Sequence, residues 1–577
     1  MELTLSGDKV GFQSITHNTI MPSVLYTPQK AAIKTNPTID PSKILEKVEE
    51  KPPPKKTLAK GIRKTYEEFC GNTSIHGFQY FGQHRPRKEI FFWIVVFAIT
   101  IYFCTSIIVR IYVKWYETPV IVSFSEKSTP IWNIPFPRVT ICPETKRSIN
   151  KTAEDTFVEL YRKMKDFEKG DRQFNENFTR TDLEDTLTLM HICNSINVNT
   201  EPIIKNLSYT DIMSRMLPNF DKYFHTCAWF GNETSCNSLF KKVYTDEGIC
   251  YVFNTLKADD MYREDVMKSK VTAESKDKQK KVPLKWSLEE GYAVGSDLHT
   301  YPARVLTSGS DAGLTIYLQS FLEEMDYSCN GPIQGFKVML HSPDDVPSVT
   351  KHFVRISMEK EVMIAIKPNM ITTSADIAAY DPEKRRCFMN KDRQLRFYKV
   401  YSQNNCEREC LTNYTLGQCK CVHFAMPRTE NMTICAEDKI ECYMKAHKKF
   451  YVKQFKDGST QDEEAADDDD CNCLPACTSL DFETEISEGY FDLVSTLEAY
   501  NSTDDYFAEY PGGKMSRLVI YFKENQFITS RRSELYGITE LVANFGGVLG
   551  LFMGVSILSV VEIIYHFTLR LWERMMG

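Results

Sequence analysis

The chain has 577 residues, of which 42% are hydrophobic and 25% are charged, and its formal net charge at pH 7 is -7. A chain of this length can form one large domain or several ordinary ones, so length alone does not define the class of protein. No basic stripe dominates the sequence, which argues against nucleic acid as the main partner. The informative features are therefore local.

Residues 1–88 form a polar N-terminal arm that we expect to lie in the cytoplasm. The arm contains the run KVEEKPPPKK, in which Pro52, Pro53 and Pro54 forbid a helix and favour an extended tether. Such compositions are typical of solvated linkers, so we assign this run no binding function.

The first long apolar segment follows the arm. From Ile90 to Val109 twenty residues carry no formal charge. As a helix they would rise roughly 30 Å, which is about the thickness of the hydrocarbon core of a bilayer. The segment begins far into the chain and has no small-residue cleavage site, so it does not resemble a removable signal peptide. We therefore expect a transmembrane helix over residues 89–113.

Residues 114–540 are too numerous for a connector, and we expect them to form one folded extracellular domain. Strand-like runs occur at CYVFNTL from Cys250, GFKVMLHS from Gly335 and SRLVIYFKEN from Ser516. Charge-rich helical patterns occur at FVELYRKMKDFEKG from Phe157 and IECYMKAHKKFYVKQF from Ile440. The mixture predicts an α+β domain.

Cysteine usage places this domain outside the cytoplasm. Of the 18 cysteines only Cys70 and Cys104 precede the domain, and the other sixteen lie within it. An even number suits disulfide pairing in an oxidising compartment. The same region contains seven N-x-S/T sequons, which are candidate N-glycosylation sites: Asn150, Asn177, Asn206, Asn232, Asn413, Asn431 and Asn501.

A dense acidic run, DEEAADDDD, extends from Asp462 to Asp470. It could hold calcium or sense protons, but it lacks the regular ligand spacing of an EF-hand loop. Consecutive like charges repel and extend a chain, which favours a solvated loop.

Ten cysteines are concentrated on both sides of this run, in CxxxC, CxC and CxCxxxC groupings. They are Cys387, Cys406, Cys410, Cys419, Cys421, Cys435, Cys442, Cys471, Cys473 and Cys477. Such groupings suit either zinc ligands or a ladder of disulfides. Thiols in an oxidising compartment seldom remain free for zinc, which favours the ladder. Spacing alone does not choose among its possible connectivities.

A second charge-free segment runs from Leu541 to Val561 and is followed by Glu562. We expect a second transmembrane helix over residues 541–569 and a short cytoplasmic tail over residues 570–577. The glycines in this segment indicate close helix packing or local unwinding.

Basic residues precede the first apolar segment and follow the second, which supports cytoplasmic termini. Arg110 and Lys114, on the other side of the first segment, weaken this bias, so the cysteines carry more weight than the charges. We therefore expect a multi-pass plasma-membrane protein with both termini in the cytoplasm. The flanking basic residues are Arg85, Arg87, Lys88, Arg570 and Arg574.

Three groups of motifs occur in order along the chain: HG at His76 and Gly77, the run CEREC...CKCVHFAMPR...CNCLPAC, and GGVLGLFMGVSILSVVE from Gly546. Together they resemble the degenerin and epithelial sodium channel family, which includes acid-sensing channels. NTSIHGFQYFG and GFKVMLHSPDDVP are most similar to the arthropod pickpocket subunits. The resemblance covers the chain from about Asn72 to Trp572. It implies a trimeric channel architecture, with two transmembrane helices and a large disulfide-rich α+β extracellular domain in each subunit.

The resemblance also implies how the cysteines pair. In the ladder it implies Cys387–Cys477, Cys406–Cys473, Cys410–Cys471, Cys419–Cys442 and Cys421–Cys435. Upstream it implies Cys142–Cys250 and Cys227–Cys236. Cys193 and Cys329 are then left over, and we pair them by elimination. Each bridge restrains the unfolded chain, typically by about 2–4 kcal/mol, so nested pairing would give a stapled rod.

Within the second span, Gly554-Val555-Ser556 matches the family's GxS selectivity tract. Glycine permits close approach and unusual backbone angles, so carbonyl groups and the Ser556 hydroxyl could replace part of an ion's water shell. Taken without the resemblance, the same small residues would indicate only a helix contact.

The resemblance assigns roles to further positions in and near the spans. His76 and Gly77 match a pair that re-enters the membrane and shapes the inner pore, although alone they would indicate a solvated histidine. Glu562 could attract cations into a wet pore or could anchor the helix at the interface. Ala543 stands at the degenerin position of the outer mouth, and Asn544 stands where acid-sensing relatives carry aspartate.

Two further departures from the acid-sensing pattern also argue against proton gating. Lys445, Lys448 and Lys449 lie where those relatives place carboxylates. The tryptophan that they carry shortly before the position of Cys387 is replaced by the charged run at residues 383–386.

No GxSxG, HExxH or phosphate-binding glycine loop occurs in the extracellular region, so we predict no enzyme, no catalytic residue, no metal site and no cofactor. The resemblance implies a pore-forming subunit of a sodium-selective, amiloride-sensitive cation channel. The extracellular domain would gate it in response to a ligand, an osmotic change or force. Its partners would be sodium ions, the lipid bilayer, an extracellular ligand and related subunits in a homotrimer or heterotrimer. Two alternatives remain open: a membrane-anchored receptor or adhesion protein, and a silent partner subunit of a heteromeric channel.

Overall fold

The computed structural model describes residues 58–82, 85–147, 179–193, 207–266, 285–297, 300–324, 332–346, 348, 352–459 and 471–576. The described residues fall into two compact units. The small unit takes residues from 1–73, 78–84 and 559–577, and the large unit takes residues from 74–77 and 85–558. Each unit is described by itself.

Several sequence-based predictions lie outside the described residues. They are the proline-rich run of the arm, the helix from Phe157, the acidic run from Asp462 to Asp470, the sequons Asn150, Asn177 and Asn206, and Cys329.

The large unit is built around an eight-stranded sheet in the order β1-β15-β12-β14-β9-β3-β4, with β13 paired to β12. Strands β14 and β15 run parallel to β12, and the other pairs are antiparallel. The strands are β1 (Val120–Pro130), β3 (Phe224–Trp229), β4 (Asn232–Thr234), β9 (Leu314–Phe321), β12 (Lys360–Thr373), β13 (Ser479–Tyr490), β14 (Gly513–Phe522) and β15 (Gln526–Glu534).

A second sheet has five strands in the order β11-β10-β2-β6-β5, and a two-stranded ribbon pairs β7 with β8. The strands are β2 (Arg138–Pro143), β5 (Phe240–Thr245), β6 (Gly248–Phe253), β7 (Trp286–Ser287), β8 (Gly291–Tyr292), β10 (Phe336–His341) and β11 (Val354–Ile356). The strand-like runs seen in the sequence from Cys250, Gly335 and Ser516 all fall in strands.

The main hydrophobic core lies between the two sheets. Alternate residues of β12, such as Val362 and Ile364, are fully buried beside Leu518 and Ile520 of the parallel strand β14. This alternation places the apolar side chains of a strand on one face. The same hydrophobic cluster includes Ile141 of β2, so it joins the second sheet to the first.

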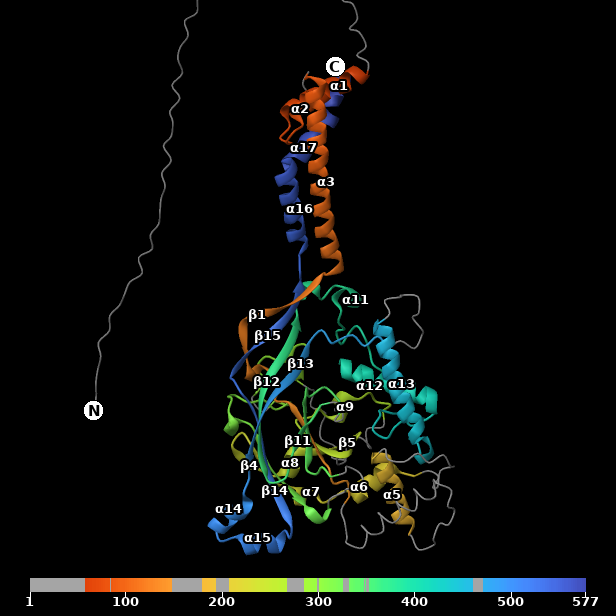
Figure 1. The fold of residues 1–577 in the computed structure, drawn as a ribbon, viewed down its shortest axis with the longest axis vertical. Helices are drawn as coiled ribbons and strands as arrows, with labels where there is room; N and C mark the ends of the chain where they lie inside the picture. The colour runs from red at the N-terminus through yellow and green to blue at the C-terminus, as the bar shows by residue number, and fades with distance from the viewer. Residues whose placement is uncertain are drawn as a thin grey trace, which may run out of the picture. The chain divides into compact units, whose positions relative to one another are not determined.

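Helices lie beside and beyond the sheets (Figure 1). The helices α12 (Gln403–Cys419) and α13 (Ile440–Ser459) pack against each other, as do α5 (Arg180–Cys193) and α6 (Tyr209–Met216). The other short helices are α7 (Phe220–Tyr223), α8 (Cys236–Leu239), α9 (Ala258–Met261), α11 (Pro382–Arg385), α14 (Leu493–Ala499) and α15 (Thr503–Glu509). Single helical turns occur at η1 (Ile131–Asn133), η3 (Ser310–Ala312), η4 (Leu322–Glu324), η5 (Ala375–Ile377) and η6 (Glu437–Lys439).

Two apolar helices extend from the eight-stranded sheet. Helix α3 (Arg87–Glu117) leads into β1, β15 leads into α16 (Ile538–Met553), and the two helices lie side by side (Figure 1). Large apolar side chains stand exposed along them, including Phe91 with 68% and Leu551 with 81% of its surface exposed. Such surfaces are stable in contact with lipid or with other helices, not with water.

The two predicted spans differ in continuity. Among the described residues, Arg87–Glu117 is the one single helix that is long and apolar enough to cross a bilayer. The second span is interrupted at residues 554–556, and the segments Ile538–Met553 and Ile557–Glu573 pass the same test only together. The glycines of this segment predicted close helix packing or local unwinding, and the structure contains a local unwinding.

The small unit contains α1 (Leu58–Asn72), α2 (Gln79–Gly82), most of α17 (Ile557–Tyr565), the π-helix η8 (His566–Arg570) and α18 (Leu571–Met576). The ring of Phe69 lies 5.5 Å from that of Phe567, and Arg570 forms an ion pair with Glu68 at 3.2 Å. These contacts hold α1 against the C-terminal helices.

Disulfides connect the elements of the large unit. The structure pairs Cys142–Cys250, Cys227–Cys236, Cys387–Cys477, Cys406–Cys473, Cys410–Cys471, Cys419–Cys442 and Cys421–Cys435, which are the pairs that the resemblance implies. Sulfur atoms of Cys406, Cys410 and Cys473 lie close enough together to hold a metal ion, but all three are in disulfides. Cys193 is also disulfide-bonded.

The ladder can be tested chemically and through surface delivery. Non-reducing peptide mapping is expected to recover Cys406 linked to Cys473. Cys406→Ser removes a restraint of about 2–4 kcal/mol, and such a loss is expected to lower the amount of protein at the cell surface several-fold in surface biotinylation. Cys104→Ser, at a free cysteine of α3, is the control and should reach the surface normally. A free Cys406 thiol in the native protein would contradict the ladder.

Candidate functional site

The break in the second span is set by the backbone of Gly554. Helix α16 ends at Met553, and Gly554 adopts a left-handed conformation with φ +66° and ψ 19°. The Gly554 N–H donates to the carbonyl of Gly550 at 2.9 Å, which closes the helix. Residues other than glycine rarely adopt this backbone conformation, so the glycine at this position determines where the helix ends.

The HG loop packs against this helix end. The backbone N–H of His76 donates to the carbonyl of Met553 at 2.8 Å. A Cβ added to Gly554 would lie 2.8 Å from atoms of the His76 imidazole, which is closer than real contacts allow. Gly77 has φ +88° and lies close to Phe97 of α3. Residues more than four hundred positions apart in the sequence are thus brought together, and each glycine meets a separate backbone requirement.

The other residues predicted for the filter and the outer mouth lie on the surface of the single chain. Ser556 is the last residue of the break and is exposed, and Val555 is partly exposed. Ala543 and Asn544 are exposed on α16. These positions are accessible to ions, lipid or other subunits.

Glu562 belongs to the small unit, where it meets the N-terminal helical segment. The Thr73 hydroxyl lies 3.5 Å from a carboxylate oxygen of Glu562. This contact orients the carboxylate from the residue that follows α1, a role that the sequence did not indicate for Thr73.

A group of cation–aromatic contacts lies where the extracellular domain meets α3. The Lys384 ammonium lies 5.2 Å from the ring centroid of Trp115 and 4.5 Å from that of Tyr380. The Tyr380 hydroxyl donates to Glu534 at the end of β15 at 3.1 Å. Such contacts stabilise by about 0.5–1 kcal/mol when exposed and more when desolvated. A lysine of the charged run thus links the base of the disulfide ladder to the outer end of α3.

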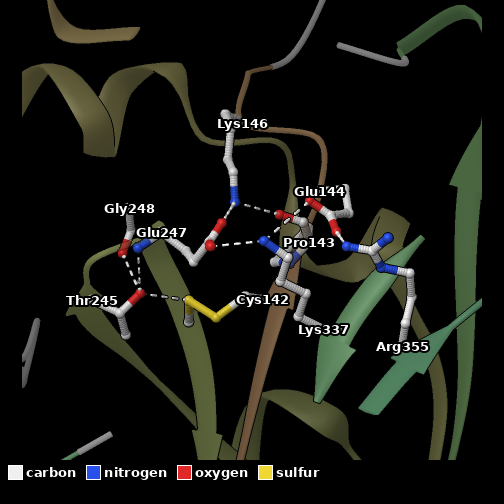
Figure 2. Close-up of polar contacts among 10 residues, drawn as sticks. Cys142, Pro143, Glu144, Lys146, Thr245, Glu247, Gly248, Lys337 and Arg355 are labelled. Atoms are coloured by element: carbon white, nitrogen blue, oxygen red, sulfur yellow. Dashed lines mark hydrogen bonds and ion pairs between the residues drawn. A yellow bond between two sulfur atoms is a disulfide. The ribbon is translucent and has the colours of Figure 1, made fainter. Parts of the chain in front are cut away.

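Figure 2 shows a second cluster, made of charged side chains in the second sheet. Glu247, in the turn between β5 and β6, accepts from Lys337 at 2.7 Å and from Lys146 at 3.3 Å. Lys146 also donates to the carbonyl of Pro143 at 2.9 Å. Glu144 pairs with Arg355 of β11 at 3.1 Å. The cluster holds the end of β2 and the turn between β5 and β6 against β10 and β11.

Burial and pairing have opposite effects on these groups. Burial raises the pKa of Glu144, although Lys146, Lys337 and Arg355 oppose the change. Burial lowers the pKa of Lys146 in spite of Glu247. For Glu247 burial would raise the pKa, but Lys146 and Lys337 outweigh it and hold the pKa below its usual range. Removing one member of such a cluster leaves a buried charge uncompensated, which typically costs about 3–5 kcal/mol.

A cavity of about 360 Å³ adjoins this cluster. Lys146 and Glu247 form part of its wall, and Arg408 of α12 holds Asp246 there through two hydrogen bonds of 2.9 and 3.2 Å. Other walls come from α5, α12, α13 and the loop that follows α12, and they include Ile192, Leu411, His423, Tyr443 and His447. The cavity has the size of a small-molecule site and mixes apolar and charged groups.

Two buried histidines join α5 to the loop that follows α12. The Nε2 of His191 donates to the carbonyl of Cys435 at 2.7 Å, and its ring lies 5.4 Å from that of His423. Burial lowers the pKa of His191 to about 4. Burial, with a smaller contribution from His191, lowers the pKa of His423 to about 3. Both rings are therefore neutral at pH 7.

Sequence reasoning missed these three clusters, because each joins residues from distant segments. Weak signals were present. Glu144, Lys146 and Arg147 lie a few residues after Cys142, and Asp246 and Glu247 lie in the turn that joins two strands. Charges in such positions are ordinary on a surface, and only the fold shows that Glu144 and Lys146 are buried and that Asp246 and Glu247 are partly buried.

One continuous apolar helix and one interrupted apolar segment flank a large disulfide-stapled domain, which is the arrangement expected of a two-span membrane protein. A family model described as "Amiloride-sensitive sodium channel" matches residues 69–566. The chain belongs to this family.

Individual relatives agree with this assignment. Pickpocket protein 28 of Drosophila melanogaster is 27% identical over 520 residues, which cover 88% of this chain and 79% of the relative. Sodium channel protein Nach of the same organism is 22% identical over 528 residues and 88% of each chain. Acid-sensing ion channel 1C of Danio rerio is 22% identical over 523 residues, which cover 88% of this chain and 84% of the relative.

Family membership establishes the general properties of the protein. It is a member of a family of plasma-membrane cation channels, which are not enzymes, and whose subunits assemble with related subunits into multimers. The family pattern of two transmembrane helices agrees with one continuous span and one interrupted span.

The buried histidine pair predicts an acid-sensitive stability. In the unfolded chain these histidines take up protons below about pH 6.5, whereas in the folded protein they do so only near pH 4 and 3. The unfolded state therefore binds more protons in between, and stability falls as the pH drops from about 6.5 towards 4, by up to about 1.4 kcal/mol per pH unit for each histidine.

Thermal unfolding of the detergent-purified protein, followed between pH 7.5 and 5, measures this slope. The double variant His191→Gln, His423→Gln should show a shallower fall than the wild type, because glutamine does not titrate. His352→Gln, at an exposed histidine, serves as the control and should leave the slope unchanged. Equal slopes for the double variant and the wild type would contradict the assignment.

The Gly554 geometry predicts a selective intolerance to a methyl group. Gly554→Ala forces a left-handed alanine, at about 1–2 kcal/mol, and a clash with His76, so current per surface channel should fall strongly. His76→Ala removes the clash, so the logarithmic loss in current per surface channel for the double variant should be smaller than the sum of the two single losses. Gly71→Ala, at a helical glycine with nothing within 4 Å of its added Cβ, should behave as wild type. A fully active Gly554→Ala channel would contradict the described loop contact.

Proposed function

We propose that this chain is a pore-forming subunit of a trimeric, sodium-selective and amiloride-sensitive channel, gated through its extracellular domain. The observation that carries the proposal is the helix break at Gly554, which is braced by the HG loop. An inert membrane anchor has no need of an interrupted span supported by a loop from the N-terminal arm.

The proposed filter is Gly554-Val555-Ser556. Two helices cannot enclose a polar path, so several subunits must contribute the walls of the pore. The broken helix leaves backbone carbonyls near Gly554 without the next helical turn, and these groups, with the Ser556 hydroxyl, can replace part of the hydration shell of sodium. The exposure of Ser556 in the single chain supports this role.

Glu562 and Ala543 take the inner and outer positions in this proposal. One Glu562 carboxylate from each subunit would raise the local concentration of sodium and repel anions. Ala543, with Asn544 beside it, would lie at the mouth, where the small side chain allows the helices to approach closely when the channel is closed.

Gating would proceed from the extracellular domain to the membrane along the disulfide ladder. The contact of Lys384 with Trp115 supports such a route, because it joins the base of the ladder to α3. The cavity beside Lys146 and Glu247 is our candidate for the point at which an extracellular ligand acts. Both termini would lie in the cytoplasm, on the sides of the two spans opposite this domain.

Current recording from cells that express Ala543→Val tests the proposal. The larger side chain would overpack the closed mouth by about 1–3 kcal/mol, and each 1.4 kcal/mol shifts the closed–open ratio about tenfold. We expect a standing inward current without stimulus that disappears when a large organic cation replaces sodium and is blocked by amiloride. In this background, a bulkier residue at Ser556 should change the sodium-to-potassium permeability ratio.

Val542→Leu is the matched control on the neighbouring position of α16 and should stay silent without stimulus. Each variant is recorded alone and with related subunits, because a partner subunit gives current only in a heteromer. Surface-expressed Ala543→Val that is silent in every combination would overturn both the mouth position and the pore assignment.

A further inference from the structure

The hairpin of β3 and β4 presents a sequon in a rigid setting. Trp229 pairs with Asn232, and the two-residue turn between them consists of Phe230 and Gly231, both with positive φ, at 52° and 72°. Such a turn matches the twist of a hairpin and fixes the directions of its side chains. The Cys227–Cys236 disulfide closes the same hairpin at its base.

A hollow of about 240 Å³ lies against this turn. Its wall includes Asn232 itself and three apolar or aromatic side chains that are unusually exposed: Phe230 at 36%, Tyr301 at 37% and Leu306 at 47%. The volume is below the range of about 300–1,000 Å³ that is typical of drug-sized ligands. It suits a single ring.

Among the described residues of the wall the one cation is Arg304, and its charged group is already paired within the protein. Its guanidinium donates to the carbonyls of Ser296 and Asp297 at 3.0 and 2.9 Å and stacks on the ring of Tyr292 at 4.3 Å. The hollow therefore offers apolar and aromatic surface with one amide at its edge. This chemistry matches the apolar face of a pyranose, whose hydroxyl groups point outward to water.

We propose that Asn232 carries an N-linked glycan and that its first N-acetylglucosamine packs into this hollow against Phe230. Asn232-Glu233-Thr234 is a complete sequon, and the domain is extracellular in this family. Asn413, Asn431 and Asn501 are also exposed. Exposure alone therefore does not select Asn232, whereas the hollow beside it does.

The covalent step is the transfer that every occupied sequon has undergone. The Nδ2 of Asn232 forms a bond to the anomeric carbon of the first sugar of a lipid-diphosphate-linked oligosaccharide. The bond between that carbon and the diphosphate oxygen breaks, the lipid diphosphate leaves, and the amide gives up one proton. The second N–H remains and can keep the present hydrogen bond to the carbonyl of Phe230, at 3.3 Å.

The position of the hairpin gives the glycan a second effect. Strand β4 is the last in the order of the eight-stranded sheet, so its outer edge has no partner strand among the described residues. Open edges and exposed apolar patches promote association with other chains. A sugar on Asn232 covers both features at once.

The test uses the full-length protein purified from cells that glycosylate. Peptide mapping should find Asn232 occupied. Asn232→Gln should lower the melting temperature by roughly 1 °C, because the same loss of stability shifts the midpoint of a domain larger than about 250 residues less than that of a small one. Trimming the glycan to one N-acetylglucosamine should leave the melting temperature unchanged, because the first sugar makes the contact.

A double-mutant cycle distinguishes packing of the sugar against Phe230 from the mere presence of a glycan on Asn232. Phe230→Gly keeps the sequon and permits positive φ, and in this background Asn232→Gln should have less than half of its effect. Leu306→Ala, away from the turn, should reduce the effect as well. Asn431→Gln is the control, and its effect should not depend on Phe230. An unoccupied Asn232, or an equal effect of Asn232→Gln with and without Phe230, would overturn the proposal.

Discussion

The disulfide ladder is the constraint on which the extracellular domain depends. Cys387–Cys477 joins the loop after α11 to the start of β13, with the two Cα atoms 4.9 Å apart. Strand β13 then pairs with β12 along its whole length. Helices α12 and α13 are thereby attached to the main sheet at its membrane end, where Lys384 meets Trp115 of α3. The chain enters and leaves the region of these two helices next to the Cys387–Cys477 bridge. The bridge limits how far the helices can move relative to the sheet at this point.

The interior away from the membrane has a different character, since it contains charges and neutral histidines that water would normally cover. Lys146, Glu247 and their partners hold the strand ends through ion pairs that are stable only while all members stay in place. His423 lines the same cavity, and the ring of His191 lies 5.4 Å from its ring. The same charged side chains line the cavity and hold the strands of the second sheet in register. A ligand that changed the shape of the cavity would therefore strain the pairing of these strands.

The membrane part relies on glycine for a complementary reason. In hydrocarbon a broken helix exposes backbone groups that have no water to bind, so a break is stable only where protein covers it. His76 supplies part of this cover by donating to Met553, and the missing side chain of Gly554 makes room for its ring. The proposed filter and the HG loop therefore form one structural element, although they come from opposite ends of the chain.

The sequence by itself determined the features that are encoded locally. Two charge-free segments, the cysteine-rich extracellular region, the strands from Cys250, Gly335 and Ser516 and the helix from Ile440 are all visible as patterns of hydrophobicity and residue type. The disulfide pairs came from family resemblance, because spacing does not fix connectivity. Only the tertiary structure decided that Lys384 lies over Trp115, that Glu144 and Lys146 are buried, and that Asn232 borders an apolar hollow. These features depend on which distant segments of the chain come into contact. The residues next to a side chain in the sequence do not determine these contacts.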